Sequence, residues 1–136
     1  LIAAGLDESA SDAPKELHGR FVNLFDPQLR FTDAVKLIPG SRAFLLDLKA
    51  AHGNEPRVLA SACKALPKSS SGKQLVLTVE GVGNTPAIVL LHAPKPPRAI
   101  TLTGQPLKDF AYSAAERLLW LRFPNETSPR ELEVQF

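Results

Sequence analysis

The chain has 136 residues, of which 44% are hydrophobic and 22% are charged, and 16 Lys and Arg against 14 Asp and Glu give a net charge of +2. This is ordinary globular usage, which excludes a disordered, fibrous or disulfide-stapled chain. The basic residues are scattered singly instead of forming a stripe, so we do not expect nucleic acid as a partner.

Residues 1–16 are expected to be a linker or an extended N-terminal segment. A short apolar patch is followed by a polar run and by Pro14, which is typical of a connector. The patch lacks the basic flank and length of a signal peptide. The chain contains no methionine, so we interpret it as a fragment or processed product of a longer protein.

Residues 17–136 are predicted to form one all-β domain. Short apolar runs, each closed by Pro, Gly, Asn or Asp, are typical of a two-layer antiparallel β-sandwich, immunoglobulin-like or similar, with about 8–10 short strands. The expected strands are Gly19–Phe25, Ala34–Leu37, Arg42–Leu48, Arg57–Lys64, Gln74–Glu80, Pro86–His92, Ala99–Thr103, Phe110–Tyr112, Leu118–Phe123 and Glu131–Phe136. Two segments of about one turn, Leu48–His52 and Ser113–Leu118, are the helix candidates.

Alternation assigns faces to several of these strands. Leu75, Leu77 and Val79 share one face of their run, which predicts a strand with one buried side. Ala87–Leu91 is apolar on both faces and therefore predicts a central strand covered on both sides. Lys68–Lys73 and Gly81–Asn84 are interpreted as hairpin loops.

No catalytic, metal or cofactor site is expected. The histidines, His18, His52 and His92, lie far apart without a second ligand at zinc spacing, so we interpret them as solvated loop or strand-end residues. There is no G-x-S-x-G elbow. Cys63 lies in an apolar run and is interpreted as a buried, inert thiol.

Two local features bear on the protein's route through the cell. The longest apolar stretches are far shorter than the roughly 20 residues of a membrane helix, so a membrane is not expected as a partner. Asn125-Glu126-Thr127 matches the N-glycosylation motif in an expected turn, which is weak evidence for a secretory route.

Trp120 is the residue of greatest functional interest. Leu119, Leu121 and Phe123 should point to the core, which places Trp120 on the other face beside Leu118 and Arg122. Such a face can dock a neighbouring domain or, with Tyr112 as a further aromatic, stack on a sugar. Docking is favoured because Leu118 widens the apolar patch.

Two stretches resemble the C-terminal β domains of glycoside hydrolases. The first is GRFVNLFDPQLRFTDAVKLIPGSRAFLL at 19–46, and the second is 99–136 with ITLTGQPL, FAYSAAERLLWLRFP and RELEVQF. The resemblance implies a sandwich packed against the catalytic domain of a secreted polysaccharide-active enzyme, with no catalytic residue in this chain. It also implies that Gly40 and Gly104 are turn residues with positive φ.

The hypothesis is therefore a non-catalytic accessory domain of a larger carbohydrate-active enzyme. It would stabilise or orient the neighbouring catalytic domain of the same polypeptide, in an extracytoplasmic location. Two alternatives stay open: a carbohydrate-binding module acting on a polysaccharide through Trp120, Arg122 and Tyr112, or an adhesive or structural immunoglobulin-like module of a surface protein.

Overall fold

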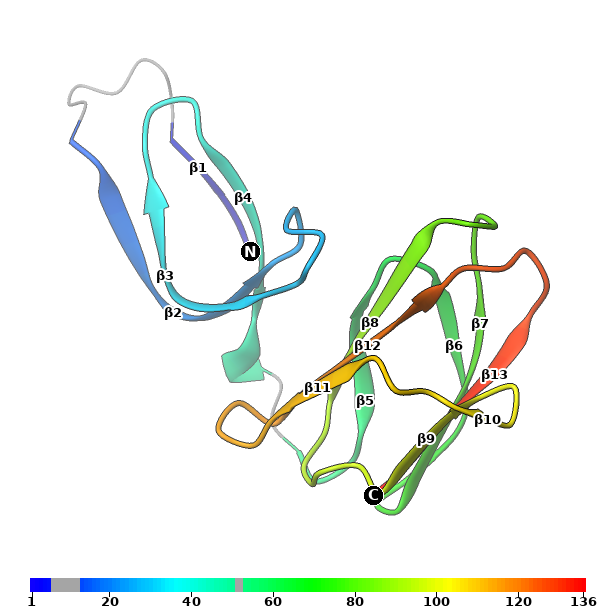
Figure 1. Ribbon diagram of the computed structural model, residues 1–136. Coiled ribbons are helices and arrows are strands. Elements are labelled where there is room, and N and C mark those ends of the chain that lie inside the picture. Colours follow the sequence, from blue (N-terminus) through cyan, green and yellow to red (C-terminus); the bar gives the residue numbers. More distant parts are fainter. Residues whose placement is uncertain (6–12, 51–52) are drawn as a thin grey trace. The chain divides into compact units, whose positions relative to one another are not determined.

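The computed structural model describes residues 1–5, 13–50 and 53–136 of the chain (Figure 1). The all-β prediction is confirmed: the described residues form antiparallel sheets, and their one helical element is the 3-10 turn η1 at Leu48–Ala50. The chain divides into two compact units, Leu1–His52 and Gly53–Phe136.

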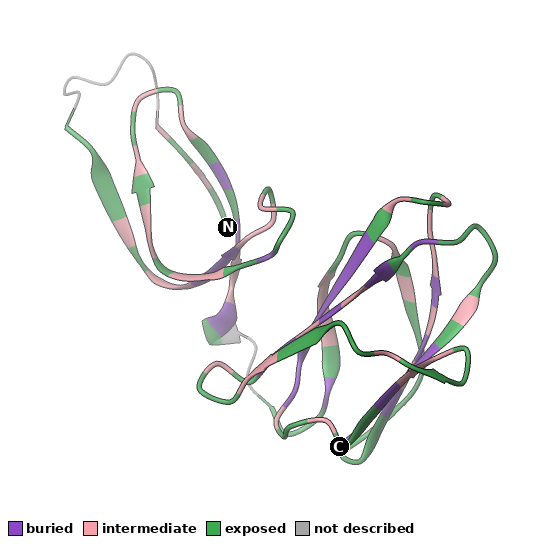
Figure 2. Ribbon diagram, in the orientation of Figure 1, coloured by how far each residue is buried: buried purple, intermediate pink, exposed green. Residues whose placement is uncertain are grey.

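The first unit is a four-stranded antiparallel sheet with the strand order β1-β4-β2-β3. One face carries a small core of Phe21, Ala43 and Leu45, against which four half-buried side chains pack: Ala3, Leu17, Val35 and Leu37. Figure 2 shows mostly intermediate and exposed residues along these strands. The strands are β1 (Ile2–Ala4), β2 (Lys15–Asn23), β3 (Phe31–Leu37) and β4 (Arg42–Asp47).

An aspartate organises the turn between β2 and β3. The Asp26 carboxylate accepts hydrogen bonds from the backbone N–H of Gln28 at 3.0 Å and from Arg30 Nε at 2.8 Å. The Arg30 guanidinium, helped by the backbone donors, lowers the pKa of Asp26 to about 2. This side chain satisfies local backbone donors and thereby stabilises the turn.

The second unit is a two-layer antiparallel sandwich. One layer has the strand order β10-β9-β13-β7-β6 and the other has the order β11-β12-β8-β5. The strands are β5 (Arg57–Ser61), β6 (Lys64–Ser71), β7 (Gln74–Glu80), β8 (Pro86–His92), β9 (Ala99–Leu102), β10 (Gln105–Pro106), β11 (Phe110–Ser113), β12 (Leu118–Pro124) and β13 (Arg130–Gln135).

The core of this sandwich lies between the two layers and follows from the alternation of each strand. The five-stranded sheet contributes Leu75, Leu77, Val79, Ile100, Leu132 and Val134, and the four-stranded sheet contributes Ala87, Val89, Leu91, Leu119, Leu121 and Phe123. Every residue of Ala87–His92 is buried, as predicted for a central strand covered on both faces (Figure 2). Burial of these side chains supplies the main driving force for folding.

Two segments of this unit differ from the sequence-based predictions. In the segment Lys68–Lys73, expected to be a hairpin loop, Gly72 and Lys73 form the turn. Ser69–Ser71 instead pair with β7 and continue β6, which satisfies their backbone hydrogen bonds, and Lys68 lies at a register shift in this pairing. Arg57–Lys64 is two strands instead of one. The chain leaves the four-stranded sheet after Ser61, whose Oγ accepts a hydrogen bond from the Cys63 N–H at 3.1 Å, and enters the five-stranded sheet at Lys64.

The segment Gly81–Asn84 connects the two layers and is not a hairpin loop. It joins β7 of the five-stranded sheet to β8 of the four-stranded sheet. A sequence of two apolar strands separated by a short polar stretch is compatible with a hairpin and with a crossing between layers. The choice depends on which other strands each of the two pairs with. Here β7 pairs with β6 and β13, and β8 pairs with β12 and β5.

The two glycine turns behave as the resemblance implied. Gly104 has φ 74° and follows Thr103 at φ 52°, so two consecutive positive angles join β9 to β10 in the manner of a tight hairpin turn. Gly40 has φ 76° in the turn between β3 and β4. A side chain at either glycine would be strained in this backbone conformation.

The predicted division into a linker at 1–16 and one sandwich at 17–136 stays a prediction. Within the first sixteen residues, Ile2–Ala4 pairs with β4, and Lys15 and Glu16 begin β2. Residues 6–12 of the predicted linker lie outside the described residues.

Candidate functional site

Trp120 and Arg122 lie on the outer face of the four-stranded sheet, as the alternation of β12 predicted. Leu119, Leu121 and Phe123 belong to the core, so the residues between them point the other way. We use the name outer apolar face for the outward side chains of the two central strands: Ile88, Leu90, Leu118, Trp120 and Arg122.

The strand register brings these side chains together. Trp120 is directly opposite Leu90, and Arg122 is directly opposite Ile88. Leu90 and Leu118 are 0% and 1% exposed, and Ile88 is 6% exposed, whereas Trp120 is half-buried. Apolar side chains on both faces of β8 and β12 mean that this layer does not have the one wet face of an ordinary sandwich sheet.

Arg122 is held at the side of this face. Its backbone N–H donates to the Asp109 carbonyl oxygen at 3.0 Å, and its Nη1 lies 3.7 Å from Asp109 Oδ1. The Asp109 side chain is 70% exposed, so this ion pair contributes little to stability. The aliphatic stem of Arg122 can cover apolar surface while its charged head stays in water.

Tyr112, the third residue predicted for a sugar site, is not on this face. It pairs with the inward residue Leu119, packs against the core, and its hydroxyl lies 3.4 Å from the Ala93 carbonyl oxygen to which it donates. The structure therefore brings Trp120 and Arg122 together and places Tyr112 on the opposite side of the sheet. Alternation within β11 could not reveal this, because the relative parity of two strands depends on their register.

His92 is a buried member of the same outward row, which the sequence interpretation of a solvated histidine did not anticipate. It is 4% exposed and pairs across strands with Leu118. Its Nε2 lies 3.0 Å from the Gly53 carbonyl oxygen; since a carbonyl only accepts, Nε2 is the donor. His18 is exposed and lies 3.4 Å from a Glu16 oxygen, and His52 lies outside the described residues.

The first unit contains an aromatic pair that sequence reasoning missed. Phe25 and Phe44 are 64% and 41% exposed, and their ring centroids lie 6.1 Å apart with the planes tilted by 54°. Rings tilted in this way do not form a flat platform for a sugar ring. Phe44 belongs to β4 and Phe25 follows β2, so only the sheet brings them together.

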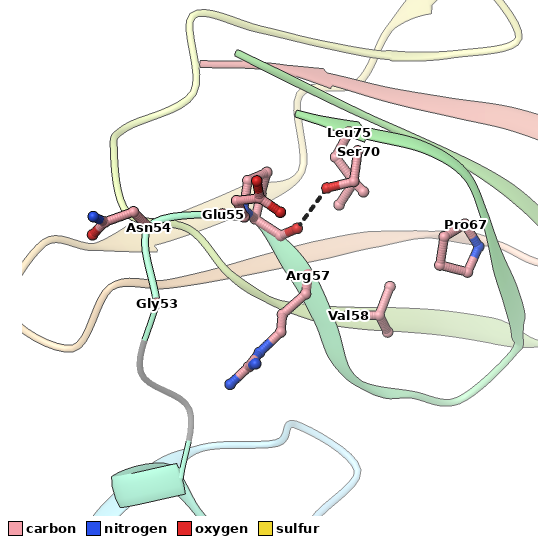
Figure 3. A pocket seen from close by; sticks show the side chains of 9 residues that line it. Gly53, Asn54, Glu55, Arg57, Val58, Pro67, Ser70 and Leu75 are labelled. Carbon is pink, nitrogen blue, oxygen red and sulfur yellow. Dashed lines mark hydrogen bonds between the residues drawn. The ribbon is translucent and has the colours of Figure 1, made fainter. Parts of the chain in front are cut away.

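A hollow of about 460 Å³ lies along Gly53–Val58, Pro67, Ser70 and Leu75 (Figure 3). The Ser70 hydroxyl donates to the Pro56 carbonyl oxygen at 3.0 Å, which closes part of this hollow. Its charged residues, Glu55 and Arg57, are both exposed. The hollow thus holds no buried acid, base or nucleophile that could act on a bound molecule.

The described residues hold neither a metal-binding cluster nor a membrane-spanning helix. Within 1–5, 13–50 and 53–136, no group of three or more His, Cys, Asp or Glu side chains is placed to hold a metal ion. No helix among these residues is long and apolar enough to cross a membrane. Cys63 is half-buried, with its Sγ 3.2 Å from Ser61 Oγ.

Comparisons with known proteins give one structural similarity. No protein family and no curated protein sequence matches the chain. Among solved structures, the chain is similar to a mutant of the GH31 dextranase of Flavobacterium johnsoniae in complex with isomaltotriose. The TM-score is 0.45 and the identity 10%, over 95% of this chain and 25% of that chain, so the chain spans about a quarter of the dextranase.

This similarity relates a β-rich chain to part of a longer glycoside hydrolase. At so low a TM-score and identity, it carries no argument about activity or ligand. The class defined by the fold is therefore an all-β protein with a two-layer antiparallel sandwich in Gly53–Phe136.

Proposed function

We propose that this chain is a non-catalytic accessory β domain of a larger, extracytoplasmic carbohydrate-active enzyme. Its role is to stabilise or orient a neighbouring domain of the same polypeptide. The proposal draws on the resemblance of segments 19–46 and 99–136 to C-terminal β domains of glycoside hydrolases. The chemistry of the parent enzyme would be carried by that neighbouring domain.

The observation that carries the proposal is the outer apolar face. A sheet that faces water on one side alternates apolar and polar residues, as β13 does with Leu132 and Val134 inside and Glu133 outside. On β8 and β12 the outward positions hold leucine, isoleucine and tryptophan instead. Ile88, Leu90 and Leu118 are already buried within this chain, so the half-buried Trp120 and Arg122 are the side chains of this face that a neighbouring domain could still contact.

A carbohydrate-binding module is the competing function. The outer apolar face supports it less well than it supports docking of a domain. Sugar platforms combine aromatic rings with polar groups that fix orientation. With Tyr112 turned to the core, Trp120 is the one aromatic side chain of the outer apolar face. A lone platform gives weak affinity, because binding must first overcome the entropy lost on association.

The decisive experiment compares Trp120→Ala in the isolated chain and in the parent polypeptide. Docking predicts a greater loss of stability in the parent, by on the order of 1 to 3 kcal/mol, because the indole then covers further apolar surface. Glu133→Ala, on the outer face of the other sheet, is the matched control. It should lower the stability of the isolated chain and of the parent polypeptide by the same amount. Equal losses for Trp120→Ala would rule out docking through this face.

The same residue reports on sugar binding. Trp120 is the single tryptophan of the chain, so its fluorescence follows this face alone. We expect no change across a panel of soluble oligosaccharides. A saturable change, together with calorimetric binding that is lost in Trp120→Ala while circular dichroism shows an intact fold, would replace the accessory role with the binding module.

A further inference from the structure

The N-glycosylation motif Asn125-Glu126-Thr127 lies between β12 and β13, and the structure gives its asparagine a role inside the sandwich. We propose that Asn125 is a buried bridge between the β7–β8 and β12–β13 loops, and that a glycan on its Nδ2 atom and the native fold exclude each other. The motif is therefore not a glycan acceptor in the folded protein.

The atom that would carry a glycan is already engaged. Asn125 is 4% exposed, and its Nδ2 donates to Thr85 Oγ1 at 3.0 Å and approaches the Pro86 carbonyl oxygen at 3.5 Å. The Thr85 hydroxyl donates its single hydrogen to the Val82 carbonyl oxygen at 2.7 Å, so Oγ1 can only accept from Asn125. Both acceptors thus require the NH₂ group on this side of the amide.

A sugar would replace one of the two amide hydrogens. Two protein oxygens lie within 3.5 Å of Nδ2, so a pyranose ring attached to this atom would collide with them. Loss of an amide hydrogen would also remove one of these two hydrogen bonds from the half-buried loop. Attachment at Nδ2 therefore conflicts with the native structure in both shape and hydrogen bonding.

Backbone hydrogen bonds join the same two loops around Asn125. Its N–H donates to the Thr85 carbonyl oxygen at 2.7 Å, and its own carbonyl oxygen accepts from the Asn84 N–H at 3.2 Å. The Gly81 N–H donates to the Glu126 carbonyl oxygen at 2.9 Å. The loops cross between the same two sheets, so this bridge fixes one end of the sandwich.

The other side of the amide is equally closed. A Cβ atom built on Gly81 would lie 2.4 Å from Asn125 Oδ1 and 2.5 Å from Asn125 Cγ, so only glycine fits at position 81. Arg130 also holds the loop, because its Nη1 donates to Glu126 Oε1 at 3.0 Å and its guanidinium lies 5.5 Å from the centre of the Phe123 ring. The asparagine cannot swing outward unless these contacts break.

The first test offers the acceptor in folded and unfolded form. A purified oligosaccharyltransferase with a lipid-linked oligosaccharide is given either the native 136-residue chain or a peptide spanning residues 120–130, and modification is measured by mass spectrometry. We expect the peptide to be modified and the native chain to remain unmodified at Asn125. Comparable modification of the native chain would overturn the proposal, as would an unmodified peptide beside a modified chain.

The second test separates the bridge from the motif. Thr127 is exposed, so Thr127→Ala removes the motif and leaves Asn125 in place. Made in a host without N-glycosylation, Thr127→Ala should melt like the wild type, whereas Asn125→Asp, which keeps the shape but turns a carboxylate oxygen towards two acceptors, should melt several degrees lower. Wild-type melting of Asn125→Asp would refute the bridge.

The third test uses a glycosylating secretory host. We expect wild-type protein that is secreted in the folded state to carry no glycan at Asn125, and Thr127→Ala to be secreted at least as well. A glycan at Asn125 on protein with the wild-type melting temperature would contradict the proposal, as would a lower yield of Thr127→Ala.

Discussion

The two layers of the sandwich have similar inner faces and different outer faces. On the five-stranded sheet the outer face is polar, with cross-strand pairs such as Lys68–Glu131 at 2.7 Å and Gln74–Glu133 at 2.8 Å between side-chain atoms. On the four-stranded sheet the corresponding positions of the central strands are apolar and largely buried. One sheet is therefore built to face water, and the other has a second apolar side.

This difference shows that period-two alternation identifies the inner face of a strand but does not say whether its outer face is polar or apolar. The inner faces follow alternation in both layers, because each core side chain must leave water. The outer faces are free to follow function, since a two-layer sandwich already has its core. Outer side chains are therefore the place to look for a partner.

The largest expected effect tests the shared inner faces. Leu121→Ala and Leu77→Ala, one from each layer, should each lower the free energy of unfolding by about 2–5 kcal/mol, because both leucines are fully buried and leave a cavity. Urea denaturation followed by Trp120 fluorescence measures this within the second unit. A loss below about 1 kcal/mol at either position would show that the core assignment of that layer is incorrect.

The second prediction compares the outer faces directly. Leu90→Ala should cost about 2–4 kcal/mol, because Leu90 is 0% exposed on the outer apolar face. Val76→Ala, at a half-buried outward position of β7, should cost about 1 kcal/mol or less. Urea denaturation of the two variants measures both losses of stability. Equal losses for Leu90→Ala and Val76→Ala would contradict the difference between the two outer faces.

The smallest effect sharpens the description of the polar face. Hydrogen bonds from the Gln135 and Gln74 amides, at 2.7 and 2.8 Å, lower the pKa of Glu133 below its ordinary value. Since the folded pKa is the lower one, the associated stability is present above the ordinary pKa of Glu133 and is lost as pH falls through the folded value. Gln135→Ala should raise the pKa of Glu133, measured by NMR titration of its carboxyl carbon.

Gln105→Ala, on β10 of the same sheet, is the control for this titration. Gln105 is exposed and takes no part in the Glu133 hydrogen bonds. The pKa of Glu133 should be the same in this variant as in the wild type. An equal rise in both variants would mean that general charge effects, and not the two amides, set the pKa.

Much of the fold could be predicted from the sequence because the relevant signals are local. Val89 and Leu121 belong to short apolar runs bounded by turn residues, and both runs are strands as expected. The run of Val89 is also a central strand, as predicted. The outward direction of Trp120 followed from period-two alternation within its own strand. These features depend only on neighbours in sequence.

Other features depended on pairing. Tyr112 faces the core because it is opposite Leu119. The residues of β11 alone do not indicate this register. The serines at 69–71 have the composition of a loop, yet their backbone groups pair with β7 and continue a strand. In both cases the register of pairing with the next strand of the chain decides the outcome.

The sequence by itself determined that this protein is all-β, where most of its strands run and which side chains of β12 turn inward. Those properties follow from backbone geometry and from the spacing of apolar residues. Only the tertiary structure decided that Gly81–Asn84 crosses between layers, that His92 is buried and that Asn125 is a bridge. The physical reason is that burial and hydrogen-bond partners arise from contacts between residues far apart in the chain, which local patterns do not encode.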